Sequence, residues 1–155
     1  MTTLLILAYN EEKYIEATVL RYVNEFQKII IVDDYSKDNT LAICKKLSST
    51  YKNIEVIENP KNYGAGRSFE LGVQNFLNSN SDSLLKIDGD DQFKHIDVLK
   101  IKKINKNEQP DFIKCDRFWE NGIEGSIPPI RYLGNAFASI LLKFLTGNWK
   151  ISDPL

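Results

Sequence analysis

Continuous apolar runs alternate along the first part of the chain with segments whose apolar residues recur at helical spacing. A continuous run is typical of a strand buried on both faces of a parallel sheet, whereas a spacing of three and four residues is typical of an amphipathic helix. The strands that these runs predict are 3–7, 28–32, 54–57 and 83–87. The helices that the spacing predicts are 14–23, a helix beginning at Leu41, 69–77 and 96–104.

Strand and helix alternate at least three times in about 90 residues. This alternation predicts an α/β fold, with a mainly parallel sheet flanked by helices on both faces. A further strand is expected at 111–115, followed by a loop over 122–129 in which Gly and Pro interrupt any regular element. In such sheets ligands bind at the carboxyl ends of the strands, near the point where the strand order reverses. The candidate functional residues are therefore those that directly follow a strand.

The segment 88–92 follows the fourth predicted strand and holds three carboxylates within four residues. These carboxylates repel one another, and a divalent cation relieves the repulsion. Mg²⁺ and Mn²⁺ prefer hard oxygen ligands and are commonly held by one or two carboxylates together with substrate phosphates. Gly89 leaves room for a ligand close to the backbone. The alternative is a solvated acidic turn that caps the next helix, but the apolar strand before it and a second acidic pair favour a metal site.

The second acidic pair, Asp33 and Asp34, ends another predicted strand. In nucleotide-binding folds a carboxylate at this place accepts hydrogen bonds from a ribose hydroxyl or a base N–H, whereas the structural alternative is a cap for the helix after Ser36. The Gly-containing loop 62–68 opens the third predicted helix and offers N–H groups to a phosphate. It matches neither a P-loop nor a dinucleotide fingerprint, so a purely structural turn remains its alternative.

Three further side chains complete the candidates. His95 is the only histidine, so it cannot serve a catalytic triad and a metal site together, and we expect it to flank the acidic segment. Arg117 and Arg131 follow the expected fifth strand, and either guanidinium can neutralise a phosphate. A surface charge is the alternative for both arginines.

Composition limits the kinds of partner. The formal net charge of −1 gives no overall basic field, so no nucleic-acid partner is expected. Cys44 and Cys115 lack zinc-site spacing and favour reduced thiols in the cytoplasm over a disulfide framework. No run reaches the roughly 18 apolar residues that span a bilayer. The apolar segment 132–145 is either an amphipathic helix on the cytoplasmic face of a membrane or a core helix.

Four segments stand in order along the chain: 8–12 (AYNEE), 32–40 (VDDYSKDNT), 62–66 (NYGAG) and 88–90 (DGD). Together they resemble the motifs of family 2 glycosyltransferases, which have the GT-A (nucleotide-diphospho-sugar transferase) fold, a Rossmann-like arrangement. Further along, 116–118, 131–135 and 152–154 resemble the dolichyl-phosphate mannosyltransferase-like branch of that family. Members of the branch transfer a sugar from a nucleotide donor to a polyprenyl phosphate.

The resemblance implies roles for individual residues. Those implied to bind the nucleotide-sugar donor are Tyr9, Glu11, Val32, Asp34, Asp88, Gly89, Asp90, Arg117 and Arg131. The metal ligands implied by the DxD motif are Asp88 and Asp90, together with Gln92. The expected catalytic residues are Asp90, Asp91 and Arg117, with Asp91 acting as a base if the acceptor is a hydroxyl.

This sequence departs from the family pattern at two positions and at its end. Many members have Pro where Leu7 stands and Gly where Tyr35 stands, and we expect Tyr35 to reshape the wall of the nucleotide pocket. The family usually continues past the Asp-Pro pair with Ser-Gly-Phe and then basic residues, whereas this chain ends at Leu155. We therefore expect residues 1–155 to be a glycosyltransferase catalytic domain truncated at its C-terminal end.

The function that the resemblance implies is that of an inverting hexosyltransferase of cell-envelope glycan synthesis. It would require Mg²⁺ or Mn²⁺ and would move a sugar from a UDP- or GDP-sugar to dolichyl or undecaprenyl phosphate. A phosphate monoester has a second pKa of about 6, so such an acceptor is largely anionic and needs little help from a base. The alternatives are transfer to a polysaccharide or glycan hydroxyl, an inactive fragment that binds nucleotide sugar, and a Rossmann-type oxidoreductase. The lack of GxGxxG after the first strand argues against the oxidoreductase.

Overall fold

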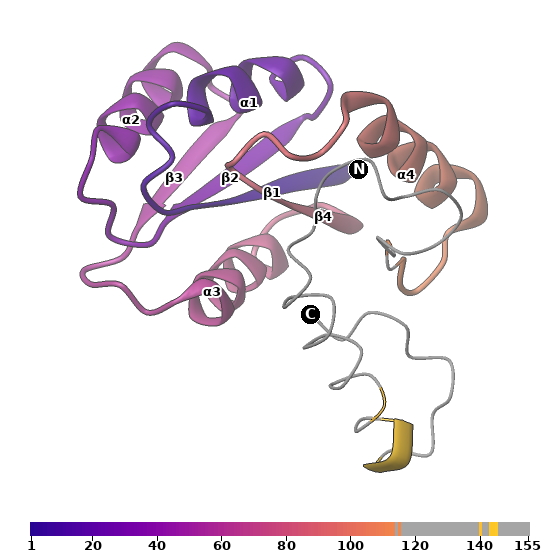
Figure 1. Ribbon diagram of the computed structural model, residues 1–155. Helices are drawn as coiled ribbons and strands as arrows, with labels where there is room; N and C mark the ends of the chain where they lie inside the picture. Colours follow the sequence, from indigo (N-terminus) through magenta and orange to yellow (C-terminus); the bar gives the residue numbers. More distant parts are fainter. Residues whose placement is uncertain (114, 116–139, 141–142, 146–155) are drawn as a thin grey trace. The chain divides into compact units, whose positions relative to one another are not determined.

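The computed structural model describes residues 1–113, 115, 140 and 143–145, and it divides the chain into two compact units, Met1–Pro110 and Asp111–Leu155. The first unit alternates strands and helices along its whole length (Figure 1). In chain order its elements are β1 (Thr2–Ala8), α1 (Ile15–Tyr22), β2 (Lys28–Asp33), α2 (Thr40–Thr50), β3 (Ile54–Glu58), α3 (Ala65–Leu77), β4 (Ser83–Asp88) and α4 (His95–Glu108). The predicted α/β class is confirmed, and only α3 begins noticeably earlier than predicted.

The sheet has the order β3-β2-β1-β4, and all three strand pairs are parallel. The chain runs outward from β1 to β2 and β3, and then returns to the other side of β1 with β4. The strand order therefore reverses between β1 and β4, which is the place where open α/β sheets bind ligands. The predicted mainly parallel sheet is confirmed.

Helices cover both faces of the sheet, because successive residues of a strand point to opposite faces. The alternate residues Leu4, Ile6 and Ala8 of β1 pack with apolar residues of α1, α2 and α4. Leu5 and Leu7 face the other way and pack with residues of β2 and with Phe76 of α3. Figure 1 shows α3 on the face opposite α1 and α2. Both faces of β1 are thus buried, as its continuous apolar run predicts.

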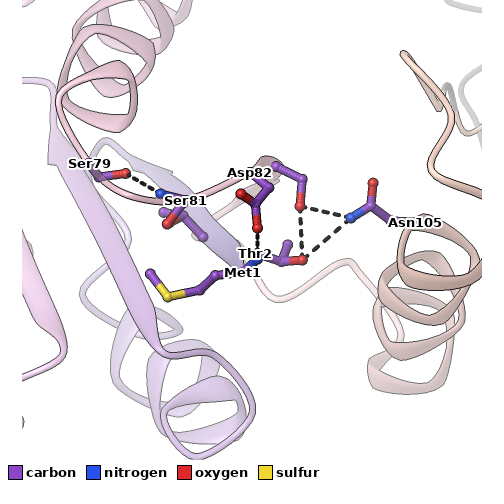
Figure 2. A network of polar contacts seen from close by, with 8 residues as sticks. Met1, Thr2, Ser79, Ser81, Asp82 and Asn105 are labelled. Carbon is purple, nitrogen blue, oxygen red and sulfur yellow. Dashed lines mark hydrogen bonds and ion pairs between the residues drawn. The ribbon is translucent and has the colours of Figure 1, made fainter.

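Polar contacts join the first residues of β1 and β4, at the amino ends of the strands. Figure 2 shows the amino group of Met1 pairing with the carboxylate of Asp82. The hydroxyls of Thr2 and Ser83 lie 2.9 Å apart, and the side-chain amide of Asn105 on α4 donates to Ser83 Oγ at 2.8 Å. These contacts fix the alignment of β4 on β1 and so fix which residues of the two strands end side by side.

Beyond α4 the description is sparse. The strand predicted at 111–115 is wrong for residues 111–113 and 115, which lie outside any strand. The side chain of Phe112 is 81% exposed, whereas the apolar residues of the central strands β1 and β2 are buried. Of the apolar segment 132–145, residues 140 and 143–145 are helical and the others lie outside the described residues. No helix in the described part of the chain has the length and apolar character needed to cross a membrane.

Candidate functional site

The carboxyl ends of β1, β2 and β4 bring the predicted site segments together. Leu7 pairs with Asp88 of β4, and Ala8 pairs with Asp33 of β2. The ladder continues past the strands, because the backbone N–H of Gly89 donates to Leu7 O and that of Asp34 donates to Ala8 O, both at 2.9 Å. The segments after the three strands therefore leave the sheet side by side at the point where the strand order reverses.

The loops after β1 and β2 are held to each other by backbone-to-side-chain hydrogen bonds. Asn10 donates its N–H to Ser36 Oγ at 3.0 Å and accepts from the N–H of Lys37 at 2.7 Å. The N–H of Glu11 donates to Thr40 Oγ1 at 2.7 Å. These bonds give the loop that carries Tyr9 and Glu11 a defined conformation, although the loop contains no regular structure.

Four described non-glycine residues have left-handed backbones, and three of them follow β1, β2 and β4, one after each strand. The φ angles are 57° for Asn10, 64° for Tyr35 and 60° for Asp91. Such backbones are uncommon outside glycine and persist where surrounding contacts fix them, often at functional sites. Glycine adopts this angle without strain, so the backbone at Tyr35 suits the Gly that the family resemblance leads us to expect at this position. Its ring is stacked under the Lys37 ammonium, which lies 3.3 Å from the ring centroid.

The adjacent carboxylates Asp33 and Asp34 have different surroundings. Asp33 is fully buried, and its Oδ2 accepts the N–H of Ser36 at 3.0 Å. This bond lies in the loop before α2, whose N-cap is Asn39, so Asp33 does not cap that helix. Asp34 Oδ1 accepts from Asn59 Nδ2 at 2.7 Å and from the N–H of Tyr63 at 2.9 Å, while its Oδ2 accepts the N–H of Gly64 at 2.7 Å. Asp33 therefore bonds within the loop after β2, whereas Asp34 bonds to the loop after β3.

The hydrogen bonds to Asp34 determine its acidity. Burial by itself raises the pKa of this carboxyl group, but the N–H of Tyr63, the amide of Asn59, the N–H of Gly64 and the hydroxyl of Ser68 stabilise the charged form. Their sum holds the pKa of Asp34 below its ordinary value of 3.8. Asp34 is therefore ionised near neutral pH and fastens the loop after β3 to the end of β2.

The acidic loop, residues 88–92, contains three carboxylates in three different situations. Asp88 Oδ1 lies 2.6 Å from the Lys86 ammonium. Both oxygens of Asp91 accept hydrogen bonds from the guanidinium of Arg21 on α1. Asp90 Oδ1 accepts the N–H of Gln92 at 3.2 Å, and in the described part of the chain no basic side chain pairs with Asp90. The negative charge of Asp90 is thus the least compensated of the three.

The pKa of Glu11 is raised by burial and by the negative charges around it at the carboxyl ends of the strands. Burial raises the pKa of its carboxyl group, and the carboxylates of Asp90, Asp38 and Asp88 raise it further. These four carboxyl groups, called the acidic cluster below, come from the last residue of β4 and from the loops after β1, β2 and β4. Like charges that act on one another in this way are destabilising, and a cation that binds beside them relieves the repulsion.

The donor atoms of this cluster fit a hard divalent cation only in part. Among the described residues, no group of three His, Cys, Asp or Glu side chains is arranged to hold a metal ion. Mg²⁺ and related ions are commonly held by one or two carboxylates, with substrate phosphates and water completing the shell. Asp88 and Asp90 can supply two carboxylates of that kind, so the residues fit a cation that binds together with a diphosphate.

The other predicted site residues differ in how exposed their side chains are. Tyr9 is 44% exposed at the end of β1, and Gln92 is exposed. Val32 is fully buried in the core beside Leu5 and Leu7, so the structure offers only its backbone to a ligand. Arg117 and Arg131 lie outside the described residues.

Gly89 serves a different purpose from the one predicted. A Cβ at this position would lie 3.1 Å from Ile15 Cδ1 and 3.3 Å from Leu7 O. The space beside Gly89 is therefore filled by α1 and β1, not kept open for a ligand, and its small size lets the acidic loop pack closely on β1. Residues outside the predicted motifs also belong here, namely Thr18, Arg21 and Asn59.

Removing the charge of Glu11 is expected to stabilise the ligand-free chain. Because the pKa of Glu11 is raised in the folded state, its ionised form costs folding free energy at neutral pH. Glu11→Gln should therefore raise Tm at pH 7, on the order of 2 °C for a partly exposed charge. The gain should disappear below the ordinary pKa of 4.5, where Glu11 is protonated in both states. Thermal unfolding at several pH values measures this, and a pH-independent difference would contradict it.

The protein is an α/β protein whose acidic cluster lies at the reversal point of its sheet, where open sheets of this kind bind ligands. The sequence matches the profile of Glycosyl transferase family 2 over residues 3–152. Because this match covers nearly the whole chain, the chain belongs to that family, as the four motifs predicted.

Two curated relatives illustrate the branch of the family. An uncharacterised protein of Methanocaldococcus jannaschii is 34% identical over 143 residues, covering 88% of this chain and 58% of the relative. A UDP-N-acetylglucosamine–dolichyl-phosphate N-acetylglucosaminyltransferase of Methanococcus voltae is 29% identical over 163 residues, covering 97% of this chain and 64% of the relative. The chain thus spans about three fifths of the length of these relatives.

Two solved structures share the fold. A mannosyltransferase from Pyrobaculum calidifontis, solved in complex with GDP-Man and Mn²⁺, superposes with a TM-score of 0.50 at 18% identity, covering 57% of this chain and 27% of that one. TarS of S. aureus superposes with a TM-score of 0.54 at 21% identity, covering 77% of this chain and 40% of that one. The predicted GT-A fold is confirmed.

Proposed function

We propose that this chain is the donor-binding part of a metal-dependent, inverting glycosyltransferase that moves a sugar from a nucleotide-sugar donor to a polyprenyl phosphate. The observation that carries the proposal is the acidic cluster at the reversal point of the sheet, in a chain of glycosyl transferase family 2. The carboxylates of Asp88, Asp90 and Asp38 act on Glu11 there, at the strand ends where a donor diphosphate and its cation would bind.

In this proposal Asp88 and Asp90 hold the cation, with Gln92 beside them at the end of the acidic loop. The cation, when bound, neutralises the charge that develops on the nucleoside diphosphate leaving group. The residues after β1 and β2 bind the nucleotide, with the exposed ring of Tyr9 beside the base or ribose. Asp34 supports that pocket by holding the loop after β3 in place.

The acceptor follows from the relatives and from the chemistry of the site. The Methanococcus voltae relative is named for transfer to dolichyl phosphate. A phosphate acceptor is already anionic and attacks the anomeric carbon without a strong base, which inverts its configuration in one displacement. A hydroxyl acceptor would need a base, and the predicted base Asp91 has both oxygens bonded to Arg21. The pairing of Asp91 with Arg21 therefore favours a lipid phosphate as the acceptor. In this proposal the chain acts at the cytoplasmic face of a membrane, and Arg117 and Arg131 bind the phosphates.

Calorimetric titration of the purified chain with UDP- and GDP-sugars, with and without Mn²⁺, tests the donor site. We expect Mn²⁺-dependent binding of one nucleotide class, with a dissociation constant between about 1 μM and 1 mM, as is common for enzyme substrates. Transfer of a labelled sugar to undecaprenyl phosphate then tests the acceptor. Binding without transfer would reduce the proposal to a nucleotide-sugar-binding fragment, and a folded chain that binds neither nucleotide class would refute it.

A further inference from the structure

Helix α1 contacts the acidic loop through Arg21, a residue that lies outside every predicted sequence motif. The guanidinium of Arg21, in the last turn of α1, donates through both terminal nitrogens to the two oxygens of Asp91, and the Nη2–Oδ2 distance is 3.0 Å. Both side chains are about one-third exposed or less. A two-point bond of this kind fixes the direction of the carboxylate as well as its distance, because the guanidinium is a planar fork.

A second contact from the same helix reaches the same loop. Thr18 lies one turn before Arg21 on the same face of α1 and is almost fully buried. Its hydroxyl lies 3.4 Å from Gly89 O and 3.5 Å from Asp91 Oδ1. On the other side, the N–H of Gly89 donates to Leu7 O of β1. Helix α1 therefore contacts the acidic loop at both Gly89 and Asp91, and β1 contacts it at Gly89.

The backbone of Asp91 needs such support. Its φ of 60° places it in the left-handed region, which costs a non-glycine residue free energy. The bond to Arg21 offsets that cost and turns the side chain of Asp91 back toward α1. Asp90, its neighbour, has no basic partner among the described residues and carries the charge that a cation would meet.

We propose that Arg21 and Asp91 form a positioning pair that sets the conformation of the acidic loop, so that Asp88 and Asp90 are presented to a cation and a donor diphosphate. In this assignment Asp91 acts through its bond to Arg21 and is not the base of the reaction. The claim that the pair aids donor binding rests on the proposed function. The claim that the pair orders the loop does not, because it concerns the ligand-free chain.

The ordering is tested first, without any ligand. Backbone amide exchange of residues 88–92 is measured in the unmodified chain, in Arg21→Met and in Asp91→Asn. Asparagine tolerates the left-handed backbone nearly as well as aspartate, so Asp91→Asn removes the charge without adding backbone strain. Both variants should exchange these amides about tenfold faster. Lys45→Met, which breaks the exposed 2.6 Å pair of Lys45 with Glu58, is the matched control and should leave them unchanged. Unchanged exchange in Arg21→Met would overturn the proposal.

Donor binding is tested next, with UDP, GDP and Mn²⁺ as probes. Residues that orient metal ligands typically contribute 10- to 100-fold to metal affinity, so each single variant should weaken Mn²⁺-dependent nucleotide binding about tenfold. The double variant should bind no more weakly than either single variant, because both changes break one interaction. Arg21→Lys should recover part of the loss, since it restores the charge but not the fork.

The outcomes separate the two proposals. If the unmodified chain binds neither nucleotide, the proposed function fails and the exchange data alone decide whether Arg21 orders the loop. If Asp91→Asn loses sugar transfer while its loop exchange and nucleotide affinity stay those of the unmodified chain, Asp91 is the base and the positioning assignment is wrong.

Discussion

Replacing Asp90 with asparagine is expected to reduce Mn²⁺-dependent nucleotide binding by at least about 100-fold, the scale on which losing one preorganised charged group usually registers. The reason lies in how the charges of the acidic loop are compensated. Asp88 has Lys86 at 2.6 Å and Asp91 has Arg21, whereas Asp90 has no basic partner among the described residues. Asparagine keeps the shape of the side chain and its hydrogen bond to the N–H of Gln92, so the change is confined to charge.

The same substitution should leave the ligand-free chain at least as stable as before. The charge of Asp90 raises the pKa of Glu11 by repulsion, and Asp90→Asn removes that repulsion. A loss of binding in a chain with an unchanged or higher Tm cannot be attributed to unfolding. Asp97→Asn on α4 is the matched control, because Asp97 is exposed, lies outside the acidic cluster and pairs only loosely with Lys100 at 3.5 Å. Nucleotide affinity in Asp90→Asn equal to that of the control would remove Asp90 from the metal site.

The arrangement of the fold follows closely from local sequence pattern. The apolar runs of β1 and β2 are continuous because both faces of these central strands are buried, and a parallel sheet with helices on both faces is what such runs indicate. The segment 111–115 (DFIKC) has only two adjacent apolar residues and a largely exposed Phe112, and no strand forms over its described residues. Periodicity therefore identified the buried strands and failed where burial, which is a tertiary property, was absent.

The location of the candidate site was predictable, but the contacts within it were not. Acidic residues directly after a strand mark the carboxyl edge of the sheet, and strand order brings those edges together. The partner of Asp91 is Arg21, which is 70 residues away in sequence, and no local signal connects the two. Gly89 correctly indicated that another group packs closely against the backbone at this position. Only the structure could show that this group belongs to α1 and β1 and not to a ligand.

Asp34→Asn is expected to lower the free energy of unfolding by about 2–3 kcal/mol, because buried hydrogen bonds to a charged group would be weakened and one donor would lose its acceptor. The carboxylate of Asp34 accepts from Asn59, Tyr63 and Gly64 and is only 5% exposed. An amide has a single oxygen, so its NH₂ group would have to face one of these N–H donors. Asp97→Asn, an exposed change of the same chemistry, should alter stability by less than about 0.5 kcal/mol.

Urea denaturation at several pH values measures the effect and its origin. Because the pKa of Asp34 is lowered in the folded state, its contribution to stability is fully present above the ordinary value of 3.8 and is lost as the pH falls through the lowered folded pKa. The difference between the unmodified chain and Asp34→Asn should therefore be constant near neutral pH and shrink in strong acid. A difference that stays the same down to the lowest pH at which the chain folds would assign it to packing instead of charge.

A second variant of the same hydrogen-bonded group separates two roles for Asp34 in nucleotide binding. Asn59→Ala removes a donor to Asp34 and also releases Ser68, which accepts from the same amide at 2.9 Å, but it leaves the carboxylate in place. If Asp34 acts only by holding the loop after β3, both variants should weaken nucleotide binding in proportion to the stability they lose. If the carboxylate also contacts the nucleotide, Asp34→Asn should weaken binding well beyond that proportion. The ratio of the two effects, measured on both variants under one set of conditions, decides between the roles.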